Sequence, residues 1–251
     1  MLQFVPPDIA ESPLVFVSED GFRGSDGRRP SSRSAGRPSD PSSEAPPSSE
    51  STPLTGRVFL GGPISVPVTP DYVAEAPDLR AFVEREAEHS AYHLVHLSVS
   101  FRSAPGLPRL YTSSVELRLS SPSKVRAPVA WSMSPLRVSD VSQTERTFSL
   151  GPELKFQDVE MTVGGYEAST SRTRAVPFLL GVRELREDPG WEFTRTRTMS
   201  LDGSHRLVLV VRSDRTAPTG VTVTVRASTR GNLLRRYKSA LPKPLTLTAV
   251  L

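Results

Sequence analysis

The chain has 251 residues, no cysteine and a formal net charge of +4. Without cysteine it can form no disulfide, thiolate metal site or cysteine nucleophile, and no stretch approaches the roughly 20 apolar residues of a membrane-spanning helix. Pro6, Pro7 and Asp8 interrupt the apolar start of the chain, so we expect no signal peptide. These features predict an intracellular protein that is soluble or peripheral to a membrane.

Residues 1–56 are predicted to form a disordered tail. Between residues 19 and 53 the apolar side chains are Phe22, Ala35 and Ala45, too few to offset the entropy of ordering the segment. Two short apolar islands, residues 2–5 and 14–17, precede this stretch. Each either docks on a partner or packs on the domain as an extra strand. The rest of the tail is predicted to be a solvated linker, or else an arm that binds protein partners or is controlled by phosphorylation.

One short helix is expected, with Asp78 as its N-cap and its end near Glu88. Leu79, Phe82 and Val83 would form a narrow apolar stripe on it. Gly61-Gly62 before it, and Gly164-Gly165 after it, lack the lysine and the strand-to-helix context of a phosphate-binding loop. Both pairs are interpreted as turns.

The spacing of His89, His93 and His96 would suit a zinc site if the helix continued through them. However, residues 91–101 have the pattern of a strand, which sends His93 and His96 to opposite faces. We therefore expect no metal ion. No G-x-S-x-G nucleophile elbow occurs either, and no other catalytic or cofactor motif stands out. The protein is predicted not to be an enzyme and to need no cofactor.

Strands dominate the rest of residues 57–251, which we expect to form one globular domain. Apolar and polar residues alternate over 113–119, 191–199 and 221–225, and residues 207–211 are apolar throughout. Turn-forming clusters separate these runs, a pattern typical of an all-β sandwich or jelly-roll-like fold. Hairpins are predicted to join 191–200 to 206–212 and 206–212 to 221–227. Trp131 and Trp191 are most simply core residues.

Positive charge is concentrated in the C-terminal region. Residues 1–56 carry five Arg and eight acidic residues, a net −3, so the remaining chain carries +7. After Asp214 no acidic residue follows. Such a stretch attracts phosphate by counterion release, and an aromatic within it can stack on an unpaired base; an anionic lipid surface would satisfy the same charges. The predicted binding residues are Arg226, Arg230, Arg235, Arg236, Tyr237, Lys238 and Lys243.

Residues 92–125, YHLVHLSVSFRSAPGLPRLYTSSVELRLSSPSKV, and 148–163, FSLGPELKFQDVEMTV, resemble the core of plant-virus cell-to-cell movement proteins of the single jelly-roll superfamily. The resemblance covers about a third of the chain. The aspartate of that family is absent after Leu119, where Ser120-Ser121-Pro122 stands, so no family residue is carried over. The resemblance implies single-stranded RNA binding, association with membranes at cell junctions and no catalysis.

The favoured function is therefore that of a non-enzymatic viral protein of movement, coat or matrix type. It would bind single-stranded RNA or an anionic membrane through its basic C-terminal region, in the host cell or the virion, and could form a homo-oligomer. The skewed composition, with abundant Arg, Ser and Pro and scarce Lys, Asn and Ile, suggests a compact, GC-rich genome. The alternative is a cellular β-sandwich adaptor that binds protein partners through its tail and sheet edges.

Overall fold

The computed structural model describes residues 7–18, 54–139, 144–145, 147–151, 154–157, 177–229, 232–240 and 245–248. For residues 144–157, 232–236 and 240 it describes the path of the backbone and not the side chains. The predicted disorder of residues 19–53 and the predicted turn at Gly164-Gly165 lie outside the described residues. The fold is an all-β sandwich, as the alternation of apolar residues predicted, and the described residues include one helix.

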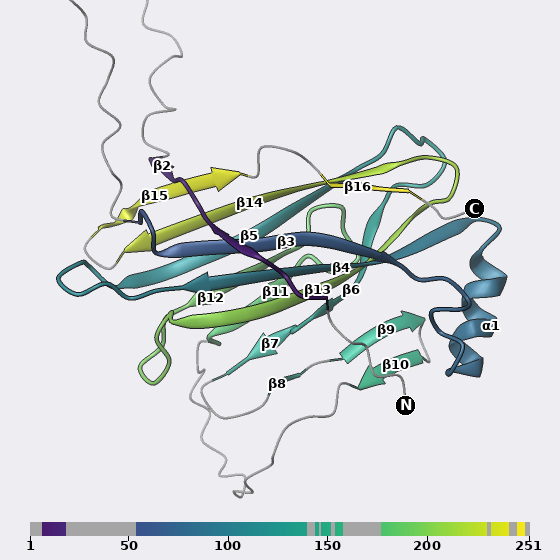
Figure 1. Cartoon of the computed structure of the whole chain (residues 1–251), viewed down its shortest axis with the longest axis horizontal. Coiled ribbons are helices and arrows are strands. Elements are labelled where there is room, and N and C mark those ends of the chain that lie inside the picture. The colour runs from purple at the N-terminus through teal and green to yellow at the C-terminus, as the bar shows by residue number, and fades with distance from the viewer. Residues whose placement is uncertain are drawn as a thin grey trace, which may run out of the picture.

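The first sheet has five antiparallel strands, and the second is larger (Figure 1). The order of the first sheet is β1 (Glu11–Pro13), β3 (Val58–Pro67), β4 (Ser90–Phe101), β13 (Gly203–Asp214) and β6 (Val129–Ser134). The order of the second is β2 (Val17–Ser18), β15 (Asn232–Ala240), β14 (Thr219–Thr229), β5 (Leu110–Ser120), β12 (Gly190–Thr194), β11 (Leu179–Val182), β7 (Arg137–Val138) and β8 (Thr144–Glu145), with β16 (Leu245–Leu247) also paired to β14. A separate hairpin pairs β9 (Thr147–Gly151) with β10 (Leu154–Gln157).

The core lies between the two sheets because both present apolar residues at every second position. Val95, Leu97 and Val99 of β4 are fully buried and belong to the same cluster as Leu117 and Leu119 of β5. The ring of Phe101 in the first sheet meets the ring of Phe193 in the second, with 5.3 Å between centroids. Trp191 is also fully buried, as predicted, whereas Trp131 is half-buried on the outer face of the first sheet.

The helix α1 (Pro77–Glu86) covers part of that outer face (Figure 1). Leu79 and Val83 on its apolar stripe are buried in a second cluster with Tyr92 and Leu94 of β4. The predicted cap was wrong: the N-cap residue is Ala76, with no side-chain cap hydrogen bond in the described structure. Pro77 follows it, and proline suits the first helical position because its missing N–H would have no partner there.

Both predicted hairpins were wrong. The strand β12 pairs with β5 and β11, β13 pairs with β4 and β6, and β14 pairs with β5, β15 and β16. Three consecutive strands thus alternate between the two sheets, and the loops between them cross the edge of the sandwich.

The apolar island at residues 14–17 packs on the domain, which is one of the two alternatives the sequence allowed. The strand β1 pairs with β3 of the first sheet, and β2 pairs with β15 of the second. Between them Leu14 and Phe16 point into the main core and are 8% and 4% exposed. We call residues 7–18 the N-terminal strap. It extends the folded domain beyond the predicted start at residue 57, as does the fully buried Leu54.

Gly61-Gly62 was wrongly interpreted as a turn. The pair lies within β3, at a break in its register with β4. A side chain at Gly61 would come within 2.5 Å of the Ser98 hydroxyl and 2.6 Å of the Ile9 side chain. Glycine is therefore needed at this position because it lets the strap lie close to the sheet.

Candidate polyanion-binding surface

The C-terminal residues predicted to bind a polyanion have different environments. Arg226 forms an ion pair with Glu116, and the Tyr237 side chain is only 6% exposed within the main core. A ring in that position is not available to stack on a base. Lys238 is half-buried and lies opposite Arg226 in the sheet. For Arg235 and Arg236 the backbone lies in β15, while Arg230 and Lys243 lie outside the described residues.

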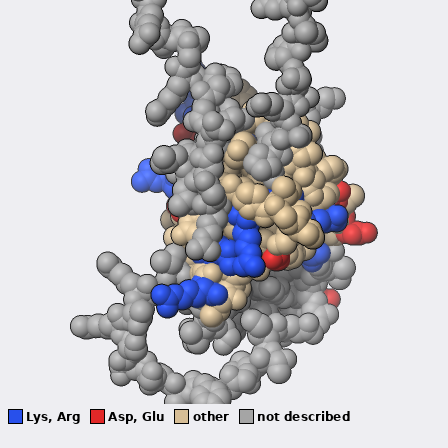
Figure 2. Space-filling model, turned by 90° about the vertical axis from the view of Figure 1, so that its left-hand side faces the viewer, with Lys and Arg blue, Asp and Glu red and all other residues tan. Residues whose placement is uncertain are grey.

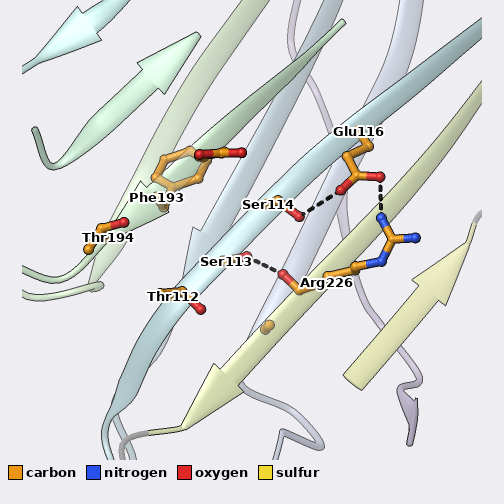
Figure 3. A pocket seen from close by; sticks show the side chains of 9 residues that line it. Thr112, Ser113, Ser114, Glu116, Phe193, Thr194 and Arg226 are labelled. Carbon is orange, nitrogen blue, oxygen red and sulfur yellow. Dashed lines mark hydrogen bonds and ion pairs between the residues drawn. The ribbon is translucent and has the colours of Figure 1, made fainter. Parts of the chain in front are cut away.

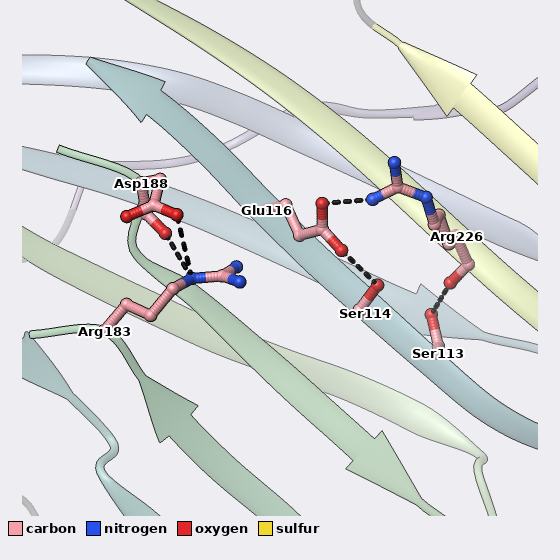
Figure 4. Close-up of polar contacts among 6 residues, drawn as sticks. All are labelled: Ser113, Ser114, Glu116, Arg183, Asp188 and Arg226. Carbon is pink, nitrogen blue, oxygen red and sulfur yellow. Dashed lines mark hydrogen bonds and ion pairs between the residues drawn. The ribbon is translucent and has the colours of Figure 1, made fainter. Parts of the chain in front are cut away.

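Arg226 lines a shallow groove of about 240 Å³ on the outer face of the second sheet (Figure 3). Glu116 accepts a hydrogen bond from the Ser114 hydroxyl at 3.2 Å as well as the ion pair from Arg226 (Figures 3 and 4). Figure 4 also shows Arg183, which reaches Asp188 at 3.4 Å. Each of these two arginines is thus matched by a carboxylate, and the groove, which Glu192 also lines, has no excess of positive charge.

Among the described residues, arginines gather instead at the end of the sandwich opposite α1. Two loops meet there, residues 102–109 between β4 and β5 and residues 195–202 between β12 and β13 (Figure 1). Seen from this end, Lys and Arg side chains lie across the centre and the lower part of the described surface, with acidic side chains beside them (Figure 2). We call this surface the arginine end. Its charged side chains are Arg57, Arg102, Arg109, Arg195 and Arg197, with one carboxylate, Asp202.

Arg57 is the fixed centre of the arginine end. Its side chain is 2% exposed and donates to the carbonyl oxygens of Arg102, at 3.3 Å, and Pro108, at 2.8 Å. Burial lowers the pKa of Arg57, and the nearby charge of Asp202 partly offsets that effect. The guanidinium still starts from so high a pKa that it remains charged. Arg57 therefore ties the 102–109 loop to the domain and adds a positive charge beneath it.

Asp202 is held in its ionised form at the same place. Its two carboxylate oxygens accept hydrogen bonds from the hydroxyls of Ser103, at 2.6 Å, and Ser200, at 2.9 Å. Burial by itself would raise the pKa of Asp202, but these hydrogen bonds and the charge of Arg57 together lower it. The carboxylate joins the two loops to each other and offsets one of the arginines.

A cavity of about 540 Å³ opens between the two loops. Arg57, Arg109 and Arg195 line it together with Asp202, so the charges of the described residues on its walls sum to +2. The Arg195 backbone N–H donates to the carbonyl of Tyr111 at 2.9 Å, and the Nη1 atom of its side chain is buried without a hydrogen-bond partner among the described residues. A buried donor of this kind costs about 1–3 kcal/mol until an acceptor reaches it.

Sequence reasoning missed this cavity because its three arginines come from distant parts of the chain. One signal was present: Arg195 and Arg197 continue the alternation of Trp191 and Phe193, so two charges follow the apolar face of a predicted strand. In the structure β12 ends at Thr194, and the loop to β13 begins at Arg195, whose N–H still bonds to Tyr111 of β5. Charged residues in phase with an apolar face therefore marked the point where the chain enters the arginine end.

The structure places the three histidines of the predicted spacing apart from one another. His93 and His96 both lie in β4 and their side chains alternate across it, as predicted, while His89 is exposed in the turn after α1. Among the described residues no group of three His, Asp or Glu side chains is placed to hold a metal ion. In the same part of the chain no helix has the length and apolar character needed to cross a membrane.

Comparison with known proteins returns no matching family model and no matching curated protein. Among solved structures, the chain is similar to the Clostridium perfringens NetB toxin in its membrane-inserted form. The identity is 10%, and the match covers 63% of this chain and 82% of that chain with a TM-score of 0.28. A TM-score this low does not establish a shared fold.

Proposed function

We propose that this is a non-enzymatic protein that binds single-stranded RNA, with the arginine end as its principal contact to the phosphates. The observation that supports the proposal is the cavity in which Arg57, Arg109 and Arg195 face one carboxylate. The guanidinium group presents several N–H donors in a planar fork that fits phosphate oxygens. Each phosphate that is neutralised releases condensed counterions, which supplies affinity without reading the base sequence.

The shape of the surface favours RNA over a membrane as the polyanion. A cavity between two loops admits a phosphate group that projects from a flexible chain, whereas a bilayer presents a broad plane. Membrane-surface binding draws on buried apolar area as well as charge, and Leu107, 45% exposed, is the one large apolar side chain of the two described loops that is prominently exposed. Binding to anionic vesicles in place of RNA is thus an outcome that the test below must distinguish.

Two further parts of the proposal rest on the sequence. The viral movement, coat or matrix class depends on the composition and the resemblance described above, and it stays a prediction. The basic strand β15 begins beside the arginine end, since Asn232 pairs with Thr229 and Thr229 pairs with Leu110. We therefore expect RNA to continue from the arginine end along β15.

The adaptor alternative is less favoured, because the apolar side chains Leu14 and Phe16 are occupied within the core.

The proposal is tested by measuring RNA affinity across a salt series with three variants of the full chain. The first removes arginines of the exposed loops, Arg102→Ala/Arg109→Ala/Arg197→Ala. The second, Arg235→Ala/Arg236→Ala/Lys238→Ala, tests β15. The matched control, Arg118→Ala/Arg137→Ala/Arg186→Ala, removes the same charge from exposed positions outside the two loops.

For single strands the slope of log affinity against log salt changes by about 0.7 for each phosphate contact. We expect the first variant to lower the slope by about 2 and the control to leave it nearly unchanged. Equal losses in the first variant and the control would show that total charge, and not the arginine end, controls binding. If the unmodified protein binds anionic vesicles but no RNA at low salt, the proposal is wrong.

A further inference from the structure

We propose that the cavity of the arginine end is a binding site for a phosphate monoester on a ribonucleoside, either a free nucleotide or the 5′-phosphorylated end of an RNA strand. This inference rests on the proposed function and narrows it: the outer arginines would contact any phosphate of a chain, whereas the cavity would take one terminal group. The charge of the cavity, the guanidinium groups that line it and its apolar wall point to this ligand.

The charge of the cavity matches a phosphate monoester. Among the described residues of its walls, three guanidinium groups and one carboxylate leave an excess of +2. A phosphodiester in the middle of an RNA strand carries one negative charge, whereas a phosphate monoester carries about −1.5 to −2 at neutral pH. The monoester would therefore neutralise the walls nearly completely.

The donors are already held in place. Arg57 is fixed by the carbonyl oxygens of Arg102 and Pro108, and the backbone of Arg195 is fixed by Tyr111. The buried Nη1 atom of Arg195 has no acceptor among the described residues. The Arg195 side chain also lines the cavity, and a guanidinium group there can give a phosphate oxygen charge-assisted hydrogen bonds, the stronger kind. Because these groups need little ordering on binding, less affinity is lost to conformational entropy.

The rest of the cavity suits the nucleoside. Its volume of about 540 Å³ lies within the range of roughly 300–1,000 Å³ that is typical of small-molecule pockets. Leu107 and Leu110 provide an apolar wall. An ionised carboxylate has about four acceptor positions, so Asp202 retains capacity for a sugar hydroxyl after accepting from Ser103 and Ser200.

The test compares ligands that differ only in the terminal phosphate. Calorimetry of the full chain with UMP and with uridine measures the free nucleotide. Fluorescence anisotropy with a 3′-labelled RNA carrying a 5′-phosphate or a 5′-hydroxyl measures the strand end. We expect UMP to bind and uridine not to bind, and the 5′-phosphate to tighten RNA binding by at least about tenfold, the equivalent of one charge-assisted hydrogen bond.

Arg195→Gln should abolish the preference for the 5′-phosphate, whereas Arg118→Gln, on the outer face of the second sheet, should retain it. If Arg195→Gln does not fold, Arg109→Gln replaces it, because the Arg109 side chain is exposed. Equal affinity for both RNA ends together with no binding of UMP would overturn the inference and leave the proposed function standing. Binding of UMP without any RNA binding would support the cavity and refute the proposed function. A preference that survives in both variants would place the phosphate elsewhere and overturn the inference.

Discussion

At the scale of single residues, the buried histidines link stability to pH. Burial lowers the pKa of His93 to about 4, and burial also lowers the pKa of His96 and His205. In the unfolded chain these groups titrate near 6.5. Between about pH 6.5 and pH 4 the unfolded state therefore binds protons that folded His93 does not bind. The contribution of these histidines to the free energy of unfolding is therefore fully present above that window and is lost as the pH falls through it.

We predict that His93→Gln will flatten this pH dependence. Within the window a single histidine can change the free energy of unfolding by up to about 1.4 kcal/mol for each pH unit. His93→Gln should remove most of the part of this slope that comes from His93. Urea unfolding at several pH values between 4 and 7 measures the slope. His89→Gln, at an exposed position, is the matched control and should keep the slope of the unmodified protein. An unchanged slope in His93→Gln would mean that folding does not lower the pKa of His93.

Trp191 combines full burial with a specific hydrogen bond. Its Nε1 atom donates to the carbonyl of Pro135 at 3.0 Å. Trp191→Phe would remove the donor and leave both a small cavity and an unsatisfied carbonyl, so the free energy of unfolding should fall by about 2–4 kcal/mol. Denaturant titration measures it. Trp131→Phe, at a half-buried position on the outer face, should cost markedly less; equal costs would contradict the assignment of Trp191 to the core.

At the scale of elements, the sequence predicted individual strands better than their partners. The period of two in residues 113–119 and 221–225 identified β5 and β14 because a strand half-buried in a sandwich must alternate. The apolar run 207–211 identified β13, but its neighbours β4 and β6 are far away in sequence. A hairpin within one sheet and a connection that crosses to the other sheet use the same turn residues. Local sequence patterns therefore could not tell which of the two kinds of connection the chain makes.

The crossing after β13 illustrates this point. Asp214 accepts hydrogen bonds from the backbone N–H and the hydroxyl of Thr216, both at 2.8 Å. This is ordinary turn chemistry, yet here it leads into β14 of the opposite sheet. The same limit explains the site: the sequence located positive charge along the chain, but the meeting of Arg57, Arg109 and Arg195 depends on which strands lie together.

The N-terminal strap contributes Phe16 to the core between the two sheets. Phe16 is 4% exposed in the main core, whereas the adjacent Val15 is 83% exposed. Phe16→Ala should lower the free energy of unfolding by about 3–5 kcal/mol because it leaves a cavity between the sheets. Val15→Ala, the matched control, should stay within about 0.5 kcal/mol. Thermal and urea unfolding measure both changes, and a neutral Phe16→Ala would show that the strap does not pack in the core in solution.

At the scale of the whole molecule, the location of charge should matter more than its total. Arg109→Glu/Arg197→Glu and Arg118→Glu/Arg186→Glu change the net charge equally, but the first pair lies at the arginine end. Because an uneven field governs association with a polyanion, the first pair should elute from a heparin column at clearly lower salt than the second. Elution of both variants at the same salt concentration would mean that the electrostatic potential over the protein surface is effectively uniform.

The anchoring of the strap in both sheets has a practical consequence for the segment that follows it. Ser18 pairs with Tyr237 of β15, and Leu54 is fully buried, so the domain holds the chain on either side of residues 19–53. The sequence predicts that this interval is disordered, and the entropy of closing a loop grows by only about 0.6 kcal/mol for each doubling of its length. We therefore predict that a reporter domain or an affinity tag inserted there will cost little stability. A protease cut within it should yield two pieces that stay together under native conditions and separate only in denaturant.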